Sequence, residues 1–129
     1  MKIEHLAIWV RNIEELKTFY EKYFDAKSNK IYHNKTKDFR SYFLSFGAGP
    51  RLEIMQMTGI QHSANNESNQ SYGLIHFAIS VGSKELVDSK TDELRAAGYK
   101  IIGEPRTTGD GYYESVVLDP EHNRIEITV

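Results

Sequence analysis

The stretch Ile3-Glu4-His5-Leu6-Ala7-Ile8 returns later in the chain as Leu74-Ile75-His76-Phe77-Ala78-Ile79. A second pair of stretches follows at nearly the same distance. Glu53, in Leu52-Glu53-Ile54, lies 48 residues after His5, and Glu126, in Ile125-Glu126-Ile127, lies 50 residues after His76. The chain therefore contains two copies of one module, each of which opens with a histidine strand and closes with a glutamate strand. Two imidazoles and two carboxylates are a suitable ligand set for one divalent metal ion.

The pattern of apolar residues predicts the same order of elements in both halves. In the first half, we expect a helix at 13–24 that begins after Asn12, and strands at 3–10, 28–32, 41–46 and 51–57. In the second half, we expect a helix from Ser83 to about residue 97, a loop at 104–111, and strands at 74–81, 99–103, 112–118 and 124–129. The predicted class is α+β, with a first βαβββ module at 1–57, a polar linker at 58–72 and a second βαβββ module at 73–129.

Strand alternation gives the repeated residues a common orientation, because successive side chains point to opposite faces of a sheet. The residues that share a face are His5, Ala7 and Trp9 in the first strand, His76, Ala78 and Ser80 in its copy, and Glu126 and Thr128 in the last strand. The opposite faces are apolar and suit packing against the helices. We therefore expect a curved mixed β-sheet around a metal and substrate cleft, with both histidines and both glutamates facing into it.

Size and composition exclude several classes of function. Each half has about 60 residues, which is marginal for independent folding, so joint burial of the halves or a homodimer is expected. The net charge of -2 gives no general attraction to nucleic acid or to an anionic membrane, and no apolar run could span a bilayer. The chain contains no cysteine, which excludes disulfides, thiolate nucleophiles and cysteine zinc sites. The first residues do not form a signal peptide, and a cytoplasmic protein is expected.

The doubled plan, the His-x-Ala-Ile openings and the ending Asp119-Pro120-x-x-Asn123-Arg124-Ile125-Glu126 resemble the vicinal oxygen chelate superfamily. That superfamily includes glyoxalase I, methylmalonyl-CoA epimerase, fosfomycin-resistance proteins, extradiol dioxygenases and bleomycin-resistance proteins. The resemblance covers essentially the whole chain, and its ligand pattern is most similar to that of glyoxalase I. It implies that one divalent ion, which could be nickel, zinc, cobalt, manganese or iron, is bound by His5, Glu53, His76 and Glu126.

The same resemblance implies a lyase or isomerase that acts on a small α-oxygenated substrate. The metal would stabilise an enediolate as a Lewis acid, and a glutamate would move a proton between neighbouring carbons. Glu126 is the first choice for this catalytic base and Glu53 the second. Trp9 stands where glyoxalase I has an arginine for the glutathione carboxylate. Its glutathione-contacting asparagine is also missing, since Met55, Gln56 and Met57 occupy that region. These departures speak against a glutathione hemithioacetal as substrate.

Two other functions stay open. A metal-free protein could bind an aromatic or cationic drug, as bleomycin-resistance proteins do. An extradiol-type dioxygenase with ferrous iron is disfavoured by Glu53, which would fill a position that oxygen needs. The candidate substrate contacts are Arg106, Trp9, Tyr112 and Met55. All of the candidate site residues also have a purely structural explanation. Arg106 could be a solvated loop arginine, and the other three substrate contacts could be core residues. The two histidines could be hydrogen-bonded strand residues, and Glu53 and Glu126 could be partners of Arg51 and Arg124.

Overall fold

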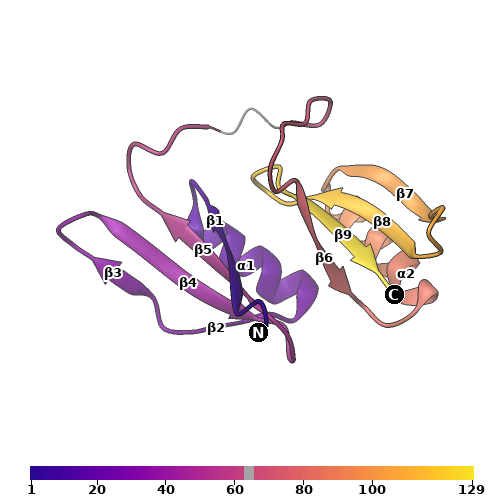
Figure 1. The fold of residues 1–129 in the computed structure, drawn as a ribbon, viewed down its shortest axis with the longest axis horizontal. Coiled ribbons are helices and arrows are strands. Elements are labelled where there is room, and N and C mark those ends of the chain that lie inside the picture. Colours follow the sequence, from indigo (N-terminus) through magenta and orange to yellow (C-terminus); the bar gives the residue numbers. More distant parts are fainter. Residues whose placement is uncertain (63–65) are drawn as a thin grey trace. The chain divides into compact units, whose positions relative to one another are not determined.

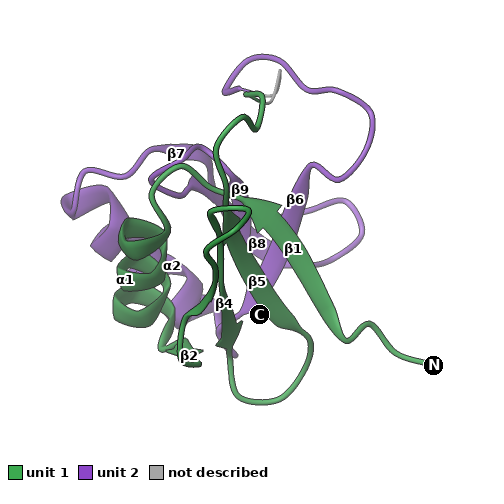
Figure 2. Ribbon diagram, turned by 90° about the vertical axis from the view of Figure 1, so that its left-hand side faces the viewer, with its two compact units in different colours: residues 1–62 green, residues 63–129 purple. Residues whose placement is uncertain are grey.

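The computed structural model describes residues 1–62 and 66–129. The chain divides into two compact units, residues 1–62 and 63–129, which are coloured separately in Figure 2. The division falls inside the predicted linker, of which residues 63–65 lie outside the described residues. Each unit is described by itself below.

The first unit is a mixed sheet covered by one helix (Figure 1). Its elements are β1 (His5–Trp9), α1 (Ile13–Phe24), β2 (Lys27–Ser28), β3 (Tyr32–Asn34), β4 (Phe39–Ser45) and β5 (Arg51–Gln56). The strand order is β1-β5-β4-β2, and β3 also pairs with β4. Strand β1 runs parallel to β5, whereas the other pairs are antiparallel. The last strand of the module thus pairs with its first strand, so β1 and β5 lie side by side.

Helix α1 occupies the predicted residues because both of its ends are capped. The side chain of Asn12 accepts a hydrogen bond from the backbone N–H of Glu15 at 3.2 Å, and Asp25 ends the helix in the left-handed conformation. Its apolar side is buried against β4 and β5, where the fully buried Leu44 and Ile54 form the centre of the core. The helix therefore covers one face of the sheet and leaves the other face for the repeated residues.

The second unit repeats this plan with one strand fewer. Its elements are β6 (His76–Ser80), α2 (Lys84–Ala96), β7 (Ile101–Thr107), β8 (Tyr113–Leu118) and β9 (Arg124–Thr128). The strand order is β6-β9-β8-β7, with β6 parallel to β9. Ser83 caps α2 by accepting from the backbone N–H of Leu86 at 3.2 Å. The α+β class and the paired βαβββ modules are therefore confirmed as two mixed sheets, each with its own helix.

The predicted strand at 28–32 is wrong in part, since the structure divides it into β2 and β3. The side chain of Asn29 accepts from the backbone N–H of Phe43 at 2.8 Å, so that the side chain replaces the next main-chain acceptor of the ladder. Beyond this break the chain pairs again with β4 through Tyr32–Asn34. A side-chain contact therefore interrupts a segment whose residue pattern is continuous.

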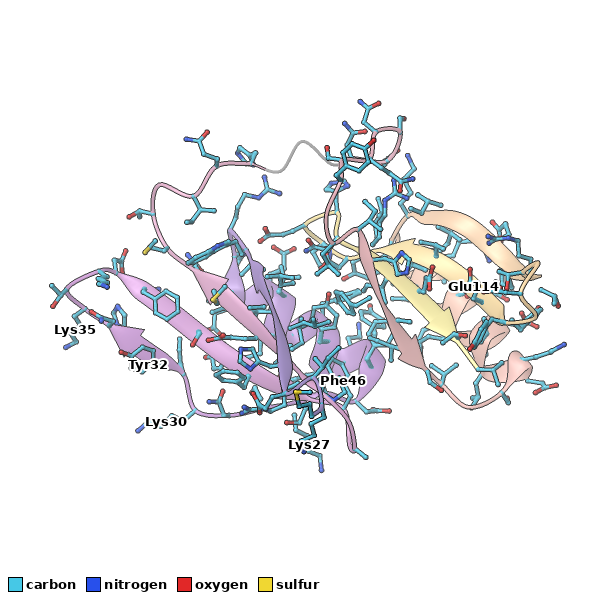
Figure 3. All side chains as sticks on the ribbon, viewed as in Figure 1. Lys27, Lys30, Tyr32, Lys35, Phe46 and Glu114 are labelled. Atoms are coloured by element: carbon cyan, nitrogen blue, oxygen red, sulfur yellow. The ribbon has the colours of Figure 1, made fainter. Side chains whose placement is uncertain are left out.

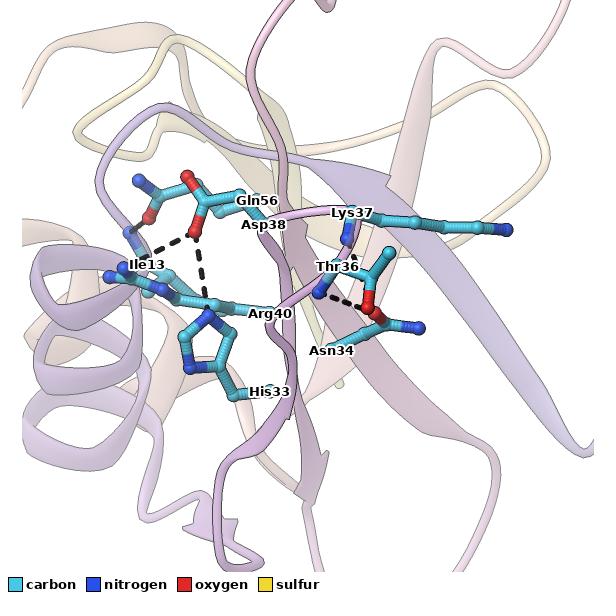
Figure 4. A network of polar contacts seen from close by, with 8 residues as sticks. All are labelled: Ile13, His33, Asn34, Thr36, Lys37, Asp38, Arg40 and Gln56. Carbon is cyan, nitrogen blue, oxygen red and sulfur yellow. Dashed lines mark hydrogen bonds and ion pairs between the residues drawn. The ribbon is translucent and has the colours of Figure 1, made fainter.

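The hairpin between β3 and β4 is stabilised by local polar contacts (Figure 4). The side-chain oxygen of Asn34 accepts from the backbone N–H groups of Thr36 and Lys37 at 3.1 and 3.2 Å. Near the same end of β4, Gln56 of β5 lies opposite Arg40, and its side chain accepts from the backbone N–H of Ile13 at 3.0 Å. This bond joins the last strand of the module to the first turn of α1.

The predicted loop at 104–111 is also wrong in part, because β7 extends to Thr107. The pairing of β7 with β8 shifts register between Ile101 and Gly103 and again between Gly103 and Arg106. Such bulges at the edge of a sheet accommodate Pro105, which cannot donate a ladder hydrogen bond. Arg106 therefore lies in a strand.

Among the described residues, no helix is long and apolar enough to cross a membrane.

Candidate functional site

The two parallel strand pairs place the repeated residues in the same register. In the first unit, His5 lies opposite Arg51 and Ala7 lies opposite Glu53. In the second unit, the same relation holds between β6 and β9, with His76 opposite Arg124 and Ala78 opposite Glu126. Each histidine is therefore a diagonal neighbour of its glutamate on the face that the helix does not cover. The structure brings His5 to Glu53 and His76 to Glu126.

The first pair lies on a partly aromatic surface. The Nε2 atom of His5 is 3.8 Å from a carboxylate oxygen of Glu53. The side chain of His5 is 39% exposed, whereas that of Glu53 is only 15% exposed. The imidazole ring also meets the ring of Phe43 edge-on, with 5.3 Å between the ring centroids. The carboxylate is thus well shielded from water, while the imidazole stays accessible.

The second pair has the same form and a closer contact. The Nε2 atom of His76 is 3.2 Å from a carboxylate oxygen of Glu126, and the two side chains are 42% and 20% exposed. In both units the Nε2 atom, and not Nδ1, is directed at the glutamate. The repeated sequence therefore produces a repeated geometry.

Both pairs fit the ligand chemistry of a divalent cation. Nitrogen and oxygen ligands that each lie about 2.1 Å from a zinc ion, at a right or tetrahedral angle, are about 3.0 to 3.4 Å apart. The 3.2 Å contact of His76 with Glu126 lies in this range, and the 3.8 Å contact of His5 with Glu53 is slightly longer. Within residues 1–62 and 66–129, no group of three or more potential ligands is assembled. Each unit thus offers two ligands.

Arg51 and Arg124 are the alternative partners that the sequence suggests for Glu53 and Glu126. In the structure both arginines contact other groups. Arg51 forms an ion pair with Glu4, and its guanidinium lies over the ring of Phe43, 4.2 Å from the centroid. Arg124 donates to the backbone carbonyls of Asn66 and Glu67 at 2.8 and 3.1 Å. The side chains that lie beside the carboxylates of Glu53 and Glu126 are therefore the histidines and not these arginines.

Glu4 connects the first histidine to the first arginine. The Nδ1 atom of His5 is 2.5 Å from one oxygen of the Glu4 carboxylate, and Arg51 binds the other oxygen. The hydrogen bond with His5, followed by that with Arg51, lowers the pKa of Glu4. The corresponding residue of the second unit is Ile75, which has no such group. The two His–Glu pairs are therefore alike in register and unlike in their surroundings.

The predicted substrate contacts are divided between the two units. Trp9 and Met55 lie directly opposite each other in β1 and β5, on the same face as the first His–Glu pair. Trp9 is 41% exposed and meets Phe39 edge-on at 6.0 Å. Tyr112 is exposed and stands just before β8, outside the strand in which it was predicted. Trp9 and Met55 are therefore beside the first pair, and Arg106 and Tyr112 belong to the second unit.

Glu114 is a candidate functional residue that the sequence did not reveal (Figure 3). It lies in β8 opposite Thr128, on the face that carries Glu126, and its side chain is only 13% exposed. A guanidinium nitrogen of Arg106 lies 3.8 Å from its carboxylate. A charged residue in the otherwise mostly apolar run at 113–118 could have drawn attention to Glu114. The face of the sheet on which Glu114 lies, however, depends on how β8 pairs with β9. Arg106 is thus partly neutralised by Glu114.

Comparison with known proteins gives the family and the fold. The family model described as Glyoxalase/Bleomycin resistance protein/Dioxygenase superfamily matches residues 2–127. A glyoxalase family protein from Enterococcus faecalis has a TM-score of 0.78 at 24% identity, covering 99% of this chain and 97% of that one. The trypanothione-dependent glyoxalase I of Leishmania major has a TM-score of 0.75 at 21% identity, covering 99% of this chain and 86% of that one. At these identities, the likeness shows the fold alone.

A sequence relative covers a smaller part of the chain. The uncharacterized protein YqjT of Bacillus subtilis is 36% identical over 58 residues. This match spans 43% of the present chain and 45% of that protein.

Proposed function

This chain belongs to the Glyoxalase/Bleomycin resistance protein/Dioxygenase superfamily, and from that premise we propose that it is a metal-dependent lyase or isomerase of the glyoxalase type. Its substrate would be a small α-oxygenated compound. The observation that carries the proposal is the repeated His–Glu pair, which recurs in identical register on β1 and β5 and on β6 and β9. Because this family includes proteins with many different reactions, membership alone does not identify the reaction. The proposed chemistry therefore rests on these four side chains.

The proposed metal site takes one divalent ion per chain, with His5, Glu53, His76 and Glu126 as its ligands. Neutral imidazoles and carboxylates accept nickel, zinc, cobalt, manganese or iron. When bound, such an ion acts as a Lewis acid toward adjacent oxygens of the substrate. Two observations support the set: in each unit the Nε2 atom points at the glutamate, and the neighbouring arginines are engaged elsewhere.

The proposed proton transfer is the task of Glu126, with Glu53 as the second candidate. A carboxylate next to the reacting carbons can accept a proton from one carbon and return it to the neighbouring carbon. Both carboxylates are shielded from water, at 20% and 15% exposure, which strengthens their interaction with nearby charge. Two such groups could serve opposite faces of one substrate.

The proposed substrate is a compound other than a glutathione adduct. Trp9 offers an apolar ring at the position where an arginine would hold a carboxylate, and Met55 lies beside it. Arg106 already has Glu114 as a partner, which reduces its pull on an anion. The side chains near the first His–Glu pair therefore favour an apolar substituent on the substrate.

A second candidate function is the metal-free binding of an aromatic compound. The specific observation in its favour is the exposed aromatic group on the first unit. Trp9 and Tyr32, which are 41% and 54% exposed, both contact the ring of Phe39 at 6.0 Å. Flat aromatic ligands bind such rings by stacking and edge contacts. Binding of this kind requires neither His5 nor His76. Replacement of these histidines therefore distinguishes the two candidate functions.

The experiment that tests the leading proposal measures proton exchange. Protein reconstituted separately with nickel, cobalt, zinc and manganese is incubated in D₂O with a panel of α-hydroxy and α-keto aldehydes and ketones. NMR then detects deuterium incorporation next to the carbonyl. We expect exchange that depends on the added metal and stops with a chelator. Tight binding of aromatic compounds with no exchange by any metal form would instead support the second candidate.

A further inference from the structure

Glu4 makes a contact that distinguishes His5 from His76. One oxygen of the Glu4 carboxylate is 2.5 Å from Nδ1 of His5, while Nε2 of the same ring is directed at Glu53. A carboxylate can only accept hydrogen bonds, so this contact requires the proton of a neutral imidazole to be on Nδ1. The lone pair then resides on Nε2, which is the atom that a metal ion would bind.

Glu4 is itself held in place by a second contact. Its other carboxylate oxygen is bound by Arg51, whose guanidinium lies over the ring of Phe43 at 4.2 Å. The same ring supports His5 edge-on at 5.3 Å. The four side chains form a closed arrangement in which Arg51 fixes Glu4 and Phe43 contacts both Arg51 and His5. An exposed glutamate would otherwise be free to leave the imidazole.

The second module does not repeat this arrangement. Ile75 occupies the position of Glu4, and its side chain cannot accept a hydrogen bond. The arginine that corresponds to Arg51 is Arg124, which donates to the backbone carbonyls of Asn66 and Glu67. His76 is therefore an internal reference, a repeated histidine with no carboxylate at the position of Glu4.

We propose that Glu4 is a positioning residue, which keeps the proton of His5 on Nδ1 and presents Nε2 to a divalent cation, so that the two repeated histidines are inequivalent. The cation part rests on the proposed function, whereas the tautomer part does not. Carboxylate partners of metal-binding histidines fix the tautomer and orientation of the ring, and their loss commonly lowers metal affinity about 10- to 100-fold.

The first test reads the tautomer directly in metal-free protein. Long-range ¹H–¹⁵N NMR separates the protonated from the unprotonated ring nitrogen of each histidine, at a pH where the spectra show both rings neutral. We expect His5 to carry its proton on Nδ1 in the wild type. Glu4→Ala should shift this population toward Nε2–H, Glu4→Gln should give an intermediate value because its amide oxygen still accepts, and His76 should not change.

The second test measures affinity for the metal alone. Zinc or nickel is titrated against a chromophoric chelator, with Glu104→Gln as the matched control. Glu104 is another exposed carboxylate bound to an arginine, since Arg95 donates to it at 2.6 Å, and it carries the same charge. We expect a loss of about 10- to 100-fold for Glu4→Ala, a smaller loss for Glu4→Gln and none for Glu104→Gln.

The outcomes separate this inference from the proposed function. A wild type that binds no divalent metal, but whose His5 tautomer responds to Glu4→Ala, overturns the proposed metal site and supports the tautomer role of Glu4. A His5 that carries its proton on Nε2 in the wild type, or an unchanged spectrum in Glu4→Ala, overturns the positioning role whatever the metal content. Equal metal affinity of Glu4→Ala and wild type overturns the cation part.

Discussion

At the scale of single residues, the two glutamates are the best-shielded members of the proposed set of four metal ligands. Glu53 and Glu126 are less than half as exposed as the histidines that they contact. A carboxylate that is withdrawn from water gains from a nearby cation, because its lost hydration is then partly replaced. The neighbouring arginines contact other groups, since Arg51 binds Glu4 and Arg124 donates to backbone carbonyls. These carboxylates are therefore well placed to balance the charge of a metal ion.

The replacement Glu126→Gln tests the proposed base. The amide keeps the size of the side chain but cannot take up a proton, so exchange of substrate hydrogen with D₂O should slow by about 100-fold or more. Glu104→Gln is the control for the loss of one negative charge, because Glu104 is a carboxylate of β7 in the same unit and lies outside the candidate site, where Arg95 binds it. The assignment fails if Glu126→Gln retains exchange within about twofold of the wild type while its metal content is equal.

At the scale of elements, a buried polar contact joins α2 to the sheet of the second unit. The hydroxyls of Thr91 in α2 and Ser115 in β8 are 2.6 Å apart, and both residues are fully buried. Thr91 also donates to the backbone carbonyl of Val87 at 2.7 Å. In a buried environment, the loss of one partner leaves the other unsatisfied, which costs about 1–3 kcal/mol.

We expect Thr91→Val to lower the free energy of unfolding by about 1–3 kcal/mol, measured by urea denaturation. Adding Ser115→Ala should cost less than the sum of the two single changes, because the pair is then removed together. Thr18→Val in α1 is the control, since exposed Thr18 makes the same backbone contact, to Glu14, at 2.8 Å. Strict additivity of the Thr91 and Ser115 changes would refute the coupling.

The contact between α1 and β2 predicts a dependence of stability on pH. The hydroxyl of Ser28 donates to Glu21 at 2.6 Å, and this bond, with a smaller contribution from Lys17, lowers the pKa of the Glu21 carboxyl. A lowered pKa in the folded state stabilises the protein above the unfolded value of about 4.3, and this stabilisation is lost as the pH falls through the folded value. Glu21→Gln should therefore be less stable than wild type near neutrality.

The measurement is urea denaturation of both proteins from neutral to acidic pH. The difference in the free energy of unfolding should shrink as the pH falls, because protonated Glu21 resembles the amide. A difference that is constant over this range would show that the charge of Glu21 does not contribute.

The elements also show how far the sequence predicts the fold. Helix α1 and the strands β1, β5, β6 and β9 follow from local features, which are period, caps and turn residues. The break at Asn29 and the extension of β7 past Pro105 depend on pairing with other strands, which single-segment patterns do not contain. In the same way, the orientations of His5 and Glu126 follow from alternation, whereas Glu114 becomes apparent only through the register of β8 on β9.

At the scale of the whole molecule, we expect the protein to be a homodimer. Each unit contains about 60 residues and has its helix on one face of the sheet, so a single chain buries a limited core. Large apolar side chains also remain exposed two residues before each repeated histidine: Ile3 is 65% exposed and Leu74 is 62% exposed. Sedimentation equilibrium should give twice the mass of one chain. A monomer at all accessible concentrations would contradict the expectation.

In the proposed site, the two His–Glu pairs serve one metal ion. Four ligands per chain then provide one site per chain, whether the two pairs come from the same chain or from partner chains. Removing either histidine should weaken the whole site, because the remaining ligands belong to the same ion. Independent pairs would behave differently, since each would hold or lose its own ion.

The most direct measurement is the metal content of reconstituted and dialysed protein, determined by elemental analysis for the wild type, His5→Ala, His76→Ala and the control His33→Ala. His33 is a histidine of the exposed hairpin strand β3. We expect one divalent ion per chain in the wild type and in His33→Ala, and little or none in His5→Ala and His76→Ala. A wild type without metal, or a full complement of metal in His5→Ala or His76→Ala, would contradict it.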